Sequence, residues 1–247
     1  MIKKLKIFVR IFVGPLFWAR NIIYEWIYSP RIDSRIEGLD CISSNGFYVY
    51  PEKLDIQSVS GLKKDFNDLQ ILKPFDLKGQ LSGRLYEHGP ISQLSEHYIN
   101  KFMSTAKAYF GSDKVRCELT MYQKSWPKDS IDDLPGGEFH EDDNKRNLKF
   151  FIYLTDVNED NGPFCYVPKT HSLRKNEKYI RWFLWEVFHT RKYLYSFKLD
   201  QKQCELDEVK VTGSAGTVFC ADTTGYHRAS APLIGERQVF VVSYTRI

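Results

Sequence analysis

Residues 216–227 read Gly-Thr-Val-Phe-Cys-Ala-Asp-Thr-Thr-Gly-Tyr-His, and this stretch typifies the C-terminal half of the chain. A short run of β-branched, aromatic and small residues ends at Asp222, a polar turn containing Gly225 follows, and His227 comes after the turn. Short apolar runs bounded by glycine and polar residues are typical of β-strands. The stretch therefore predicts a strand and a turn that together deliver a histidine to a defined place.

Runs of the same kind recur from residue 117 to the C-terminus. They are short, rich in β-branched or aromatic residues, and bounded by Gly, Pro, Asp or Asn, which favours antiparallel strands joined by turns. The predicted strands are Cys117–Gln123, Lys149–Leu154, Cys165–Val167, Val209–Val211, Thr217–Ala221 and Gln238–Tyr244, together with an earlier short strand at Gly46–Tyr50.

Helices are expected mainly before these strands. Leu94–Phe110 carries apolar residues at roughly helical intervals and ends at Gly111, a typical helix C-cap. Tyr179–Tyr195 is rich in aromatic residues and is also predicted to be helical, either as a lid over a site or as ordinary core packing. Helices followed by many short strands predict a mainly β protein: a double-stranded β-helix, or cupin-like jelly roll, with flanking N-terminal helices.

Composition and charge limit the domain organisation and the class of protein. The 247 residues show no repeat or Gly/Ser linker, which favours a single jelly-roll domain over residues 41–247 after an arm of residues 1–40. Residues 1–30 carry five basic residues and one acidic residue, Glu25, so their net charge is +4. This equals the formal net charge of the whole chain. The remainder is neutral, which argues against nucleic-acid binding. Five scattered cysteines without a CxxC pair indicate reduced thiols of a cytoplasmic protein.

The N-terminal arm has two interpretations. It begins with lysines and an apolar run, as a secretory signal does, but Arg10 interrupts the run and no small-residue cleavage site follows. Its longest uncharged stretch, Ile11–Ala19, is far shorter than the ~20 residues that span a bilayer. Residues 1–30 therefore form either an interfacial helix in peripheral contact with a membrane or a helix packed on the main domain.

A candidate metal site begins at Phe139-His140-Glu141-Asp142. Side chains at i and i+2 of a strand share a face, so His140 and Asp142 would point together while Glu141 points away. His227 offers a second imidazole far along the chain. Two imidazoles and one carboxylate form the facial triad of non-haem Fe(II) oxygenases, which leaves positions open for co-substrate and oxygen.

Arg237 lies ten positions after His227 and opens an apolar final strand. An unpaired guanidinium is costly in such a place. A carboxylate of a bound dicarboxylic acid would satisfy it through two parallel hydrogen bonds. An ion pair with an Asp or Glu of the protein is the alternative.

Four blocks in this order resemble the phytanoyl-CoA dioxygenase family of Fe(II)/2-oxoglutarate oxygenases. The resemblance runs from about Leu119 to Arg246. Lys169-Thr170 departs from the family's usual Gly-Ser, which affects a turn and leaves the ligands intact. The blocks are Phe139–Asp142, Leu148–Val157, Asn161–Ser172, and Gly216 with Asp222, His227 and Arg237.

The resemblance implies an enzyme that hydroxylates a C–H bond of a small or lipid-linked metabolite, consuming 2-oxoglutarate and O2 and releasing succinate and CO2. It implies Fe(II) held by His140, Asp142 and His227, with no catalytic residue beyond these ligands. Arg237 would bind the distal carboxylate of 2-oxoglutarate. Further hydrogen bonds to the co-substrate would come from Tyr122, Gln123 or Ser230.

Three alternatives remain to be weighed against this assignment. His171 is a rival third ligand, but in the family the histidine at this point ends a turn and does not bind the metal. Related halogenases replace the carboxylate ligand with Ala or Gly, so Asp142 disfavours halogenation. A non-enzymatic jelly roll that binds a metabolite or glycan is the rival from another class, and the intact set of His140, Asp142, His227 and Arg237 argues against it.

Overall fold

The computed structural model describes residues 35–72, 82–87, 89–127, 138–142, 146–171, 204–205 and 207–247. Residues 1–34 of the predicted arm of residues 1–40, and the predicted helix of residues 179–195, lie outside the described residues. In chain order the elements are α2 (Leu39–Asn45), β1 (Phe47–Val49), α3 (Ile56–Leu72), β2 (Ser82–Glu87), α4 (Gln93–Phe110), β3 (Val115–Ser125), β4 (Asn147–Tyr153), β5 (Phe164–Tyr166), β6 (Val209–Val211), β7 (Val218–Asp222), β8 (His227–Ala229) and β9 (Arg237–Arg246).

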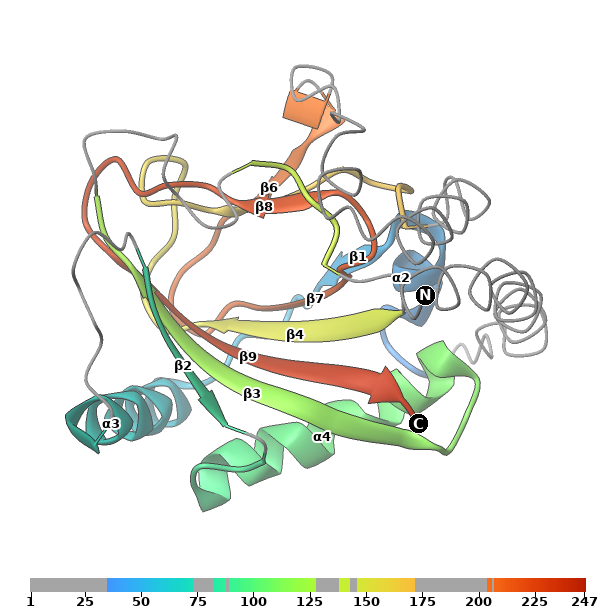
Figure 1. Cartoon of the computed structure of the whole chain (residues 1–247), viewed down its shortest axis with the longest axis horizontal. Coiled ribbons are helices and arrows are strands. Elements are labelled where there is room, and N and C mark those ends of the chain that lie inside the picture. The colour runs from blue at the N-terminus through green and yellow to red at the C-terminus, as the bar shows by residue number, and fades with distance from the viewer. Residues whose placement is uncertain are drawn as a thin grey trace, which may run out of the picture.

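Two antiparallel sheets form the body of the protein. The larger has the strand order β1-β7-β4-β9-β3-β2, and the smaller has the order β6-β5-β8. The small sheet lies over one face of the large sheet, and α3 and α4 lie against the other (Figure 1). This arrangement confirms the predicted mainly β, jelly-roll class with flanking N-terminal helices.

Strand alternation divides the large sheet into an inner and an outer face. On β4, Leu148, Phe150 and Ile152 belong to the core under the helices, whereas Phe151 and Tyr153 belong to the core between the sheets. Residues that pair across adjacent strands point to the same face of the sheet. Phe151, for example, lies opposite Phe219 and Val241. Both faces are buried, which explains why these strands read as nearly continuous apolar runs.

The core under the helices is packed largely by aromatic rings. Phe102 of α4 stacks on Phe150 of β4 with ring centroids 4.4 Å apart. Helix α4 begins at a capping box in which the Ser92 side chain accepts from the Ser95 amide, and it ends at Gly111 in the left-handed conformation with φ 60°. The predicted helix and its C-cap are therefore confirmed, with one further residue at the N-terminus.

The strand predictions are confirmed in position and are imprecise in length. Strands were predicted at the positions of β1, β3, β4, β5, β6, β7 and β9, and β3 and β9 prove longer than expected. Four of the elements in the described residues were not predicted: α2, α3, β2 and the three-residue β8. All five cysteines are free. In the part of the chain that the structure describes, no helix has the length and apolar character needed to cross a bilayer.

Candidate metal centre

His140 and His227 lie directly opposite each other on adjacent strand segments. They form an antiparallel bridge in which each residue's N–H donates to the other's carbonyl, at 3.0 and 3.1 Å. Their rings lie with centroids 4.5 Å apart. Asp142 follows His140 by two residues, and its N–H donates to the carbonyl of Thr223 at 3.0 Å. The i, i+2 spacing thus places His140 and Asp142 on one face, as predicted.

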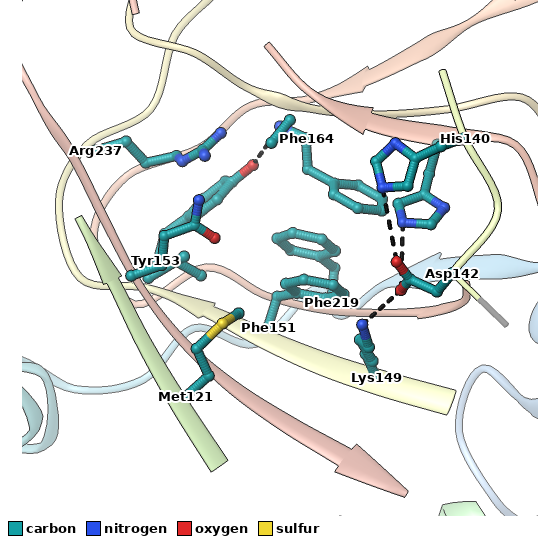
Figure 2. Close-up of a pocket in the computed structure, with 13 residues that line it drawn as sticks. Met121, His140, Asp142, Lys149, Phe151, Tyr153, Phe164, Phe219 and Arg237 are labelled. Atoms are coloured by element: carbon teal, nitrogen blue, oxygen red, sulfur yellow. Dashed lines mark hydrogen bonds and ion pairs between the residues drawn. The ribbon is translucent and has the colours of Figure 1, made fainter. Parts of the chain in front are cut away.

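Three donor atoms converge at this point. His140 Nε2 lies 3.6 Å from Asp142 Oδ1, and His227 Nε2 lies 3.5 Å from Asp142 Oδ2. All three donor atoms lie within 4.8 Å of one another, close enough to bind one metal ion (Figure 2).

Backbone carbonyls fix the tautomer of both imidazoles. His140 Nδ1 lies 2.8 Å from the carbonyl of Glu138, and His227 Nδ1 lies 2.9 Å from that of Gly225. A carbonyl can only accept, so each Nδ1 carries a proton, and in the neutral tautomer that this selects the lone pair is on Nε2. Metal-binding histidines are oriented in this way by a hydrogen bond from the second ring nitrogen.

The charge states of the cluster also suit a metal site. Burial lowers the pKa of His227, which keeps its imidazole neutral at neutral pH. Burial alone would raise the pKa of Asp142, but the neighbouring His227, His140 and Lys149 outweigh it and hold that pKa well below its usual range. An ionised carboxylate and a neutral imidazole are the forms that ligate a metal.

A polar turn positions His227. Asp222 Oδ1 accepts from the Thr224 amide at 2.9 Å and from its hydroxyl at 2.7 Å, while Oδ2 accepts from the buried hydroxyl of Tyr109 on α4. The turn then presents the Gly225 carbonyl to His227. Gly225 is required here because a Cβ would lie 2.0 Å from the Tyr166 hydroxyl oxygen. Helix α4 thus supports the candidate ligand through a buried chain of contacts.

A pocket between the sheets leads from this cluster to Arg237. Arg237 is 3% exposed and donates through Nη1 to the Gly162 carbonyl and through Nη2 to the Ser125 hydroxyl at 3.2 Å. Apolar side chains form the wall between the two ends, where Figure 2 shows Phe151, Phe164 and Phe219. The full lining is Met121, Gln123, His140, Asp142, Lys149, Phe151, Tyr153, Phe164, Phe219, His227, Ala229, Arg237 and Val239.

The family model for phytanoyl-CoA dioxygenase (PhyH) matches residues 44–232. The chain belongs to the phytanoyl-CoA dioxygenase family. No curated protein sequence matches it.

Solved structures that include metal- and 2-oxoglutarate-binding proteins share the fold at low sequence identity. The α-ketoglutarate-dependent carbocyclase SnoK of nogalamycin biosynthesis superposes with a TM-score of 0.62 at 17% identity, over 84% of this chain and 82% of SnoK. HygX from Streptomyces hygroscopicus, with nickel and 2-oxoglutarate bound, superposes with a TM-score of 0.57 at 15% identity, over 85% of this chain and 86% of HygX. EctD from S. alaskensis with bound Fe superposes with a TM-score of 0.57 at 16% identity, over 89% of this chain and 83% of EctD.

Gln123 is the predicted co-substrate contact, besides Arg237, that lies in the pocket. It lines the wall near Arg237, and its Nε2 lies 3.4 Å from the same Ser125 hydroxyl that Arg237 contacts. Tyr122, its neighbour on β3, points to the opposite face. There it stacks on Phe66, and its hydroxyl donates to Asp65 at 3.4 Å. The assignment of Tyr122 is therefore corrected: alternation along the strand turns it toward the helices.

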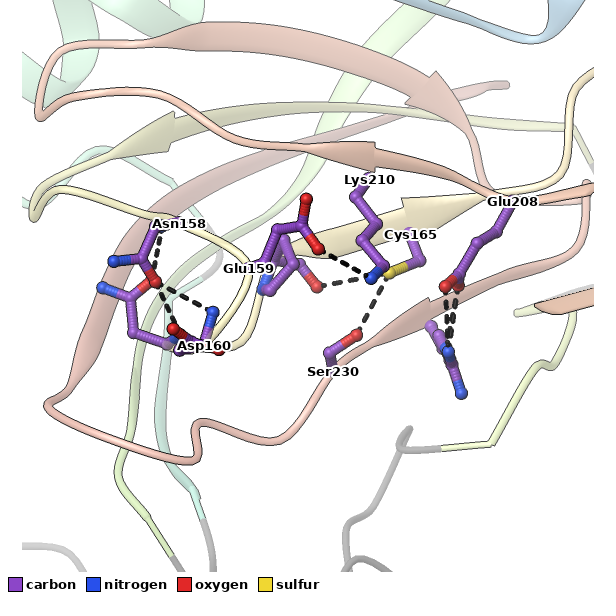
Figure 3. Close-up of polar contacts among 10 residues, drawn as sticks. Asn158, Glu159, Asp160, Cys165, Glu208, Lys210 and Ser230 are labelled. Atoms are coloured by element: carbon purple, nitrogen blue, oxygen red, sulfur yellow. Dashed lines mark hydrogen bonds and ion pairs between the residues drawn. The ribbon is translucent and has the colours of Figure 1, made fainter. Parts of the chain in front are cut away.

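Ser230 is also placed away from the pocket. Its hydroxyl lies 3.1 Å from Cys165 Sγ on the outer face of the small sheet, beside Lys210 and Glu208 (Figure 3). Burial raises the pKa of the Cys165 thiol to about 11, so this contact is structural. The residue of this segment that lines the pocket is Ala229, which lies two positions after His227 and shares its face.

The rival ligand His171 lies outside the cluster. Its ring is 8% exposed, and Nε2 lies 3.1 Å from the carbonyl of Ser43 on α2. It joins the loop after β5 to α2, in agreement with the view that it does not ligate the metal.

Sequence reasoning missed Lys149, whose Nζ lies 2.5 Å from Asp142 Oδ2. A signal was present, because Lys149 is the one charged residue of the apolar strand β4 and shares a face with Phe151 and Tyr153. Tyr153 was also missed: its hydroxyl donates to the Val211 carbonyl at 2.7 Å and accepts from the Phe164 amide at 3.1 Å, which fixes its ring in the pocket.

Proposed function

We propose that this protein is an Fe(II)- and 2-oxoglutarate-dependent dioxygenase that hydroxylates a C–H bond of a small or lipid-linked metabolite. The observation that carries the proposal is the convergence of His140, Asp142 and His227 at one end of a pocket whose other end holds the buried Arg237. Family membership and the shared fold support it.

The residues present suit the metal. Two neutral imidazole nitrogens and one ionised carboxylate are the donor set of non-haem Fe(II) sites with open positions. The side chains of His140 and Asp142 are 29% and 25% exposed, so the cluster is open on one side. The side chain of His227 is only 6% exposed and closes the other side of the cluster. A molecule entering from solvent would therefore reach the cluster on the side of His140 and Asp142.

Each described residue has a separate task in this proposal. His140, Asp142 and His227 would hold the metal, and Arg237 with Gln123 would bind the distal carboxylate of 2-oxoglutarate. The apolar wall would keep water from the space between. When bound, iron supplies the oxidative chemistry that couples decarboxylation of 2-oxoglutarate by O2 to oxidation of the substrate.

The test is an anaerobic Fe(II) titration followed by measurement of O2-dependent succinate release from 2-oxoglutarate during a screen of small metabolites. We expect Asp142→Ala to lose iron binding and succinate release. Glu141→Ala is the matched control, because this adjacent carboxylate is not part of the cluster. Equal succinate release by the wild type and Asp142→Ala would reject the proposal.

Product mass separates hydroxylation from the other outcomes of this chemistry. A product heavier by one oxygen atom identifies hydroxylation, whereas a product of unchanged mass identifies epimerisation. A screen in which a metabolite binds but neither iron binding nor succinate release occurs would support a non-enzymatic binding protein instead.

A further inference from the structure

Lys149 places a second cation in the pocket, at the end opposite Arg237. Its side chain projects from the inner face of β4, where its cross-strand partners are the small residues Ala221 and Ser243. Its ammonium contacts Asp142, and Figure 2 shows the two side chains together at the end away from Arg237. The two cations thus occupy separate places, one beside the candidate metal ligands and one at the far end.

The two ends of the pocket differ in access. The Lys149 side chain is 21% exposed, and Asp142 beside it is 25% exposed. Arg237 is only 3% exposed. A molecule entering from solvent therefore meets Lys149 and the candidate metal ligands first. The closed Arg237 end suits the co-substrate, and the open end suits the substrate to be oxidised.

The charges of the described lining residues leave the Lys149 end positive. Asp142, Lys149 and Arg237 together carry one positive charge, and histidines that bind a metal do so as neutral imidazoles. A divalent ion and the dianion 2-oxoglutarate cancel each other, so one positive charge remains after both have bound. Since Arg237 is matched by the distal carboxylate, that charge lies near Lys149. A partly buried excess charge is costly unless an ion of opposite sign joins it.

We propose that Lys149 selects a substrate that carries a single carboxylate group close to the carbon to be oxidised. This inference rests on the proposed function, because it assigns the metal and 2-oxoglutarate to the same pocket. A carboxylate matches the remaining single charge, whereas a phosphate monoester, with a charge of about −1.5 to −2, exceeds it. The ammonium would bind the carboxylate through a charge-assisted hydrogen bond.

The competing explanation is that Lys149 serves only as an ion-pair partner that holds Asp142 in place. In that case its loss would weaken metal binding and would affect charged and neutral ligands alike. Recognition of a substrate carboxylate requires a difference between the two kinds of ligand. The experiment therefore compares hexanoate with hexanamide, which has nearly the same shape and no charge.

Anaerobic protein loaded with Mn(II) and 2-oxoglutarate is the test material. Loss of the free Mn(II) electron paramagnetic resonance signal measures metal binding, and calorimetry measures 2-oxoglutarate binding. Paramagnetic relaxation of the hexanoate and hexanamide protons by bound Mn(II) then reports probe binding close to the metal. The variants are Lys149→Met, which removes the charge, and Lys149→Arg, which keeps it. Lys124→Met is the matched control, because Lys124 pairs with Glu236 at 2.6 Å and does not line the pocket.

In the wild type, Lys149→Arg and Lys124→Met, we expect hexanoate to bind about tenfold more tightly than hexanamide, as one charged hydrogen bond would give. In Lys149→Met this preference should disappear while the affinities for hexanamide, Mn(II) and 2-oxoglutarate stay close to wild type.

Other results would overturn the inference. Equal binding of the two probes to the wild type removes its basis. If Lys149→Met also lost affinity for 2-oxoglutarate, the residue would be assigned to the co-substrate. If the variant lost affinity for Mn(II) and for both probes, Lys149 would be a positioning residue for Asp142. Wild-type protein that binds no Mn(II) would reject the proposed function and this inference together. Normal Mn(II) and 2-oxoglutarate binding without probe discrimination would reject the inference alone.

Discussion

His140 and His227 are cross-strand partners that exchange two backbone hydrogen bonds, although 87 positions of sequence separate them. The spacing of the two imidazoles is therefore set by a backbone bridge between His140 and the first residue of β8. Backbone carbonyls fix both rings in addition. The centre is thus organised before any metal binds, which lowers the cost of binding.

Arg237→Gln should weaken 2-oxoglutarate binding by about 10- to 100-fold, because a charge-assisted pair contributes roughly 1.5–3 kcal/mol. Calorimetry on the Mn(II)-loaded protein measures this, and Mn(II) affinity itself should stay unchanged. Arg246→Gln at the other end of β9 is the matched control. Unchanged 2-oxoglutarate affinity in Arg237→Gln would remove Arg237 from the co-substrate site.

Tyr109→Phe should lower the free energy of unfolding by about 1.5–3 kcal/mol, because it takes a hydroxyl donor from the buried Asp222 carboxylate. Tyr244→Phe is an equally buried control whose hydroxyl donates to the neutral Ile99 carbonyl, and it should cost about 0.5–1.5 kcal/mol. Urea unfolding of the two variants measures the difference. We also expect Mn(II) affinity to fall by about tenfold in Tyr109→Phe, as for other supporting contacts of metal ligands. Equal losses of stability would contradict the account of the Asp222 turn.

Gly225→Ala should destabilise the protein by about 1–3 kcal/mol, because the added methyl overlaps the Tyr166 hydroxyl. It should also weaken Mn(II) binding, since the Gly225 carbonyl orients His227. Gly235→Ala provides the comparison: its φ of +64° makes alanine strained, yet no atom lies near the added carbon. That variant should lose stability and keep its Mn(II) affinity. A normal Mn(II) titration of Gly225→Ala would show that the turn is not needed to orient the ligand.

The metal-free protein should lose stability as the pH falls below about 6.5, the ordinary pKa of histidine. Burial lowers the pKa of His227 in the folded state, so the unfolded chain binds a proton that the folded chain does not. The free energy of unfolding should then fall by up to about 1.4 kcal/mol per pH unit from this group. Urea unfolding in EDTA between pH 5 and 8 measures the slope. His227→Gln should show a shallower slope, and identical slopes would mean that His227 titrates normally.

The sequence predicted the strands well where apolar runs were long. It predicted α4 because apolar spacing and Gly111 agreed, whereas α3 was missed even though its buried residues Val59, Leu62, Phe66 and Leu69 recur at helical intervals of three or four. A signal for α3 was present in Asp55, whose carboxylate accepts from the amides of Gln57 and Ser58 at 2.9 Å. Strand β8 reads His-Arg-Ala and has no β-branched or large apolar residue, unlike the equally short β5 and β6.

The structure brings some of the predicted site residues to the pocket and places others away from it, and one physical cause separates them. Gln123 reaches the pocket and Tyr122 does not, because neighbouring residues of a strand face opposite sides. The same parity places Ala229 in the pocket and Ser230 on Cys165. Hydrogen-bonding ability suggested Tyr122 and Ser230 from the sequence, but only the register of the strands decides which side chains share a face.

By itself the sequence determined the jelly-roll class, through the short apolar runs between turns, and the pairing of His140 with Asp142, through their i, i+2 spacing. Both are local properties of the chain. Only the tertiary structure decided that His227 lies opposite His140, that Arg237 is buried at the far end of the pocket, and that Lys149 contacts Asp142. These relationships join different segments of the backbone, and they depend on how those segments pair in register, which no single stretch of sequence specifies.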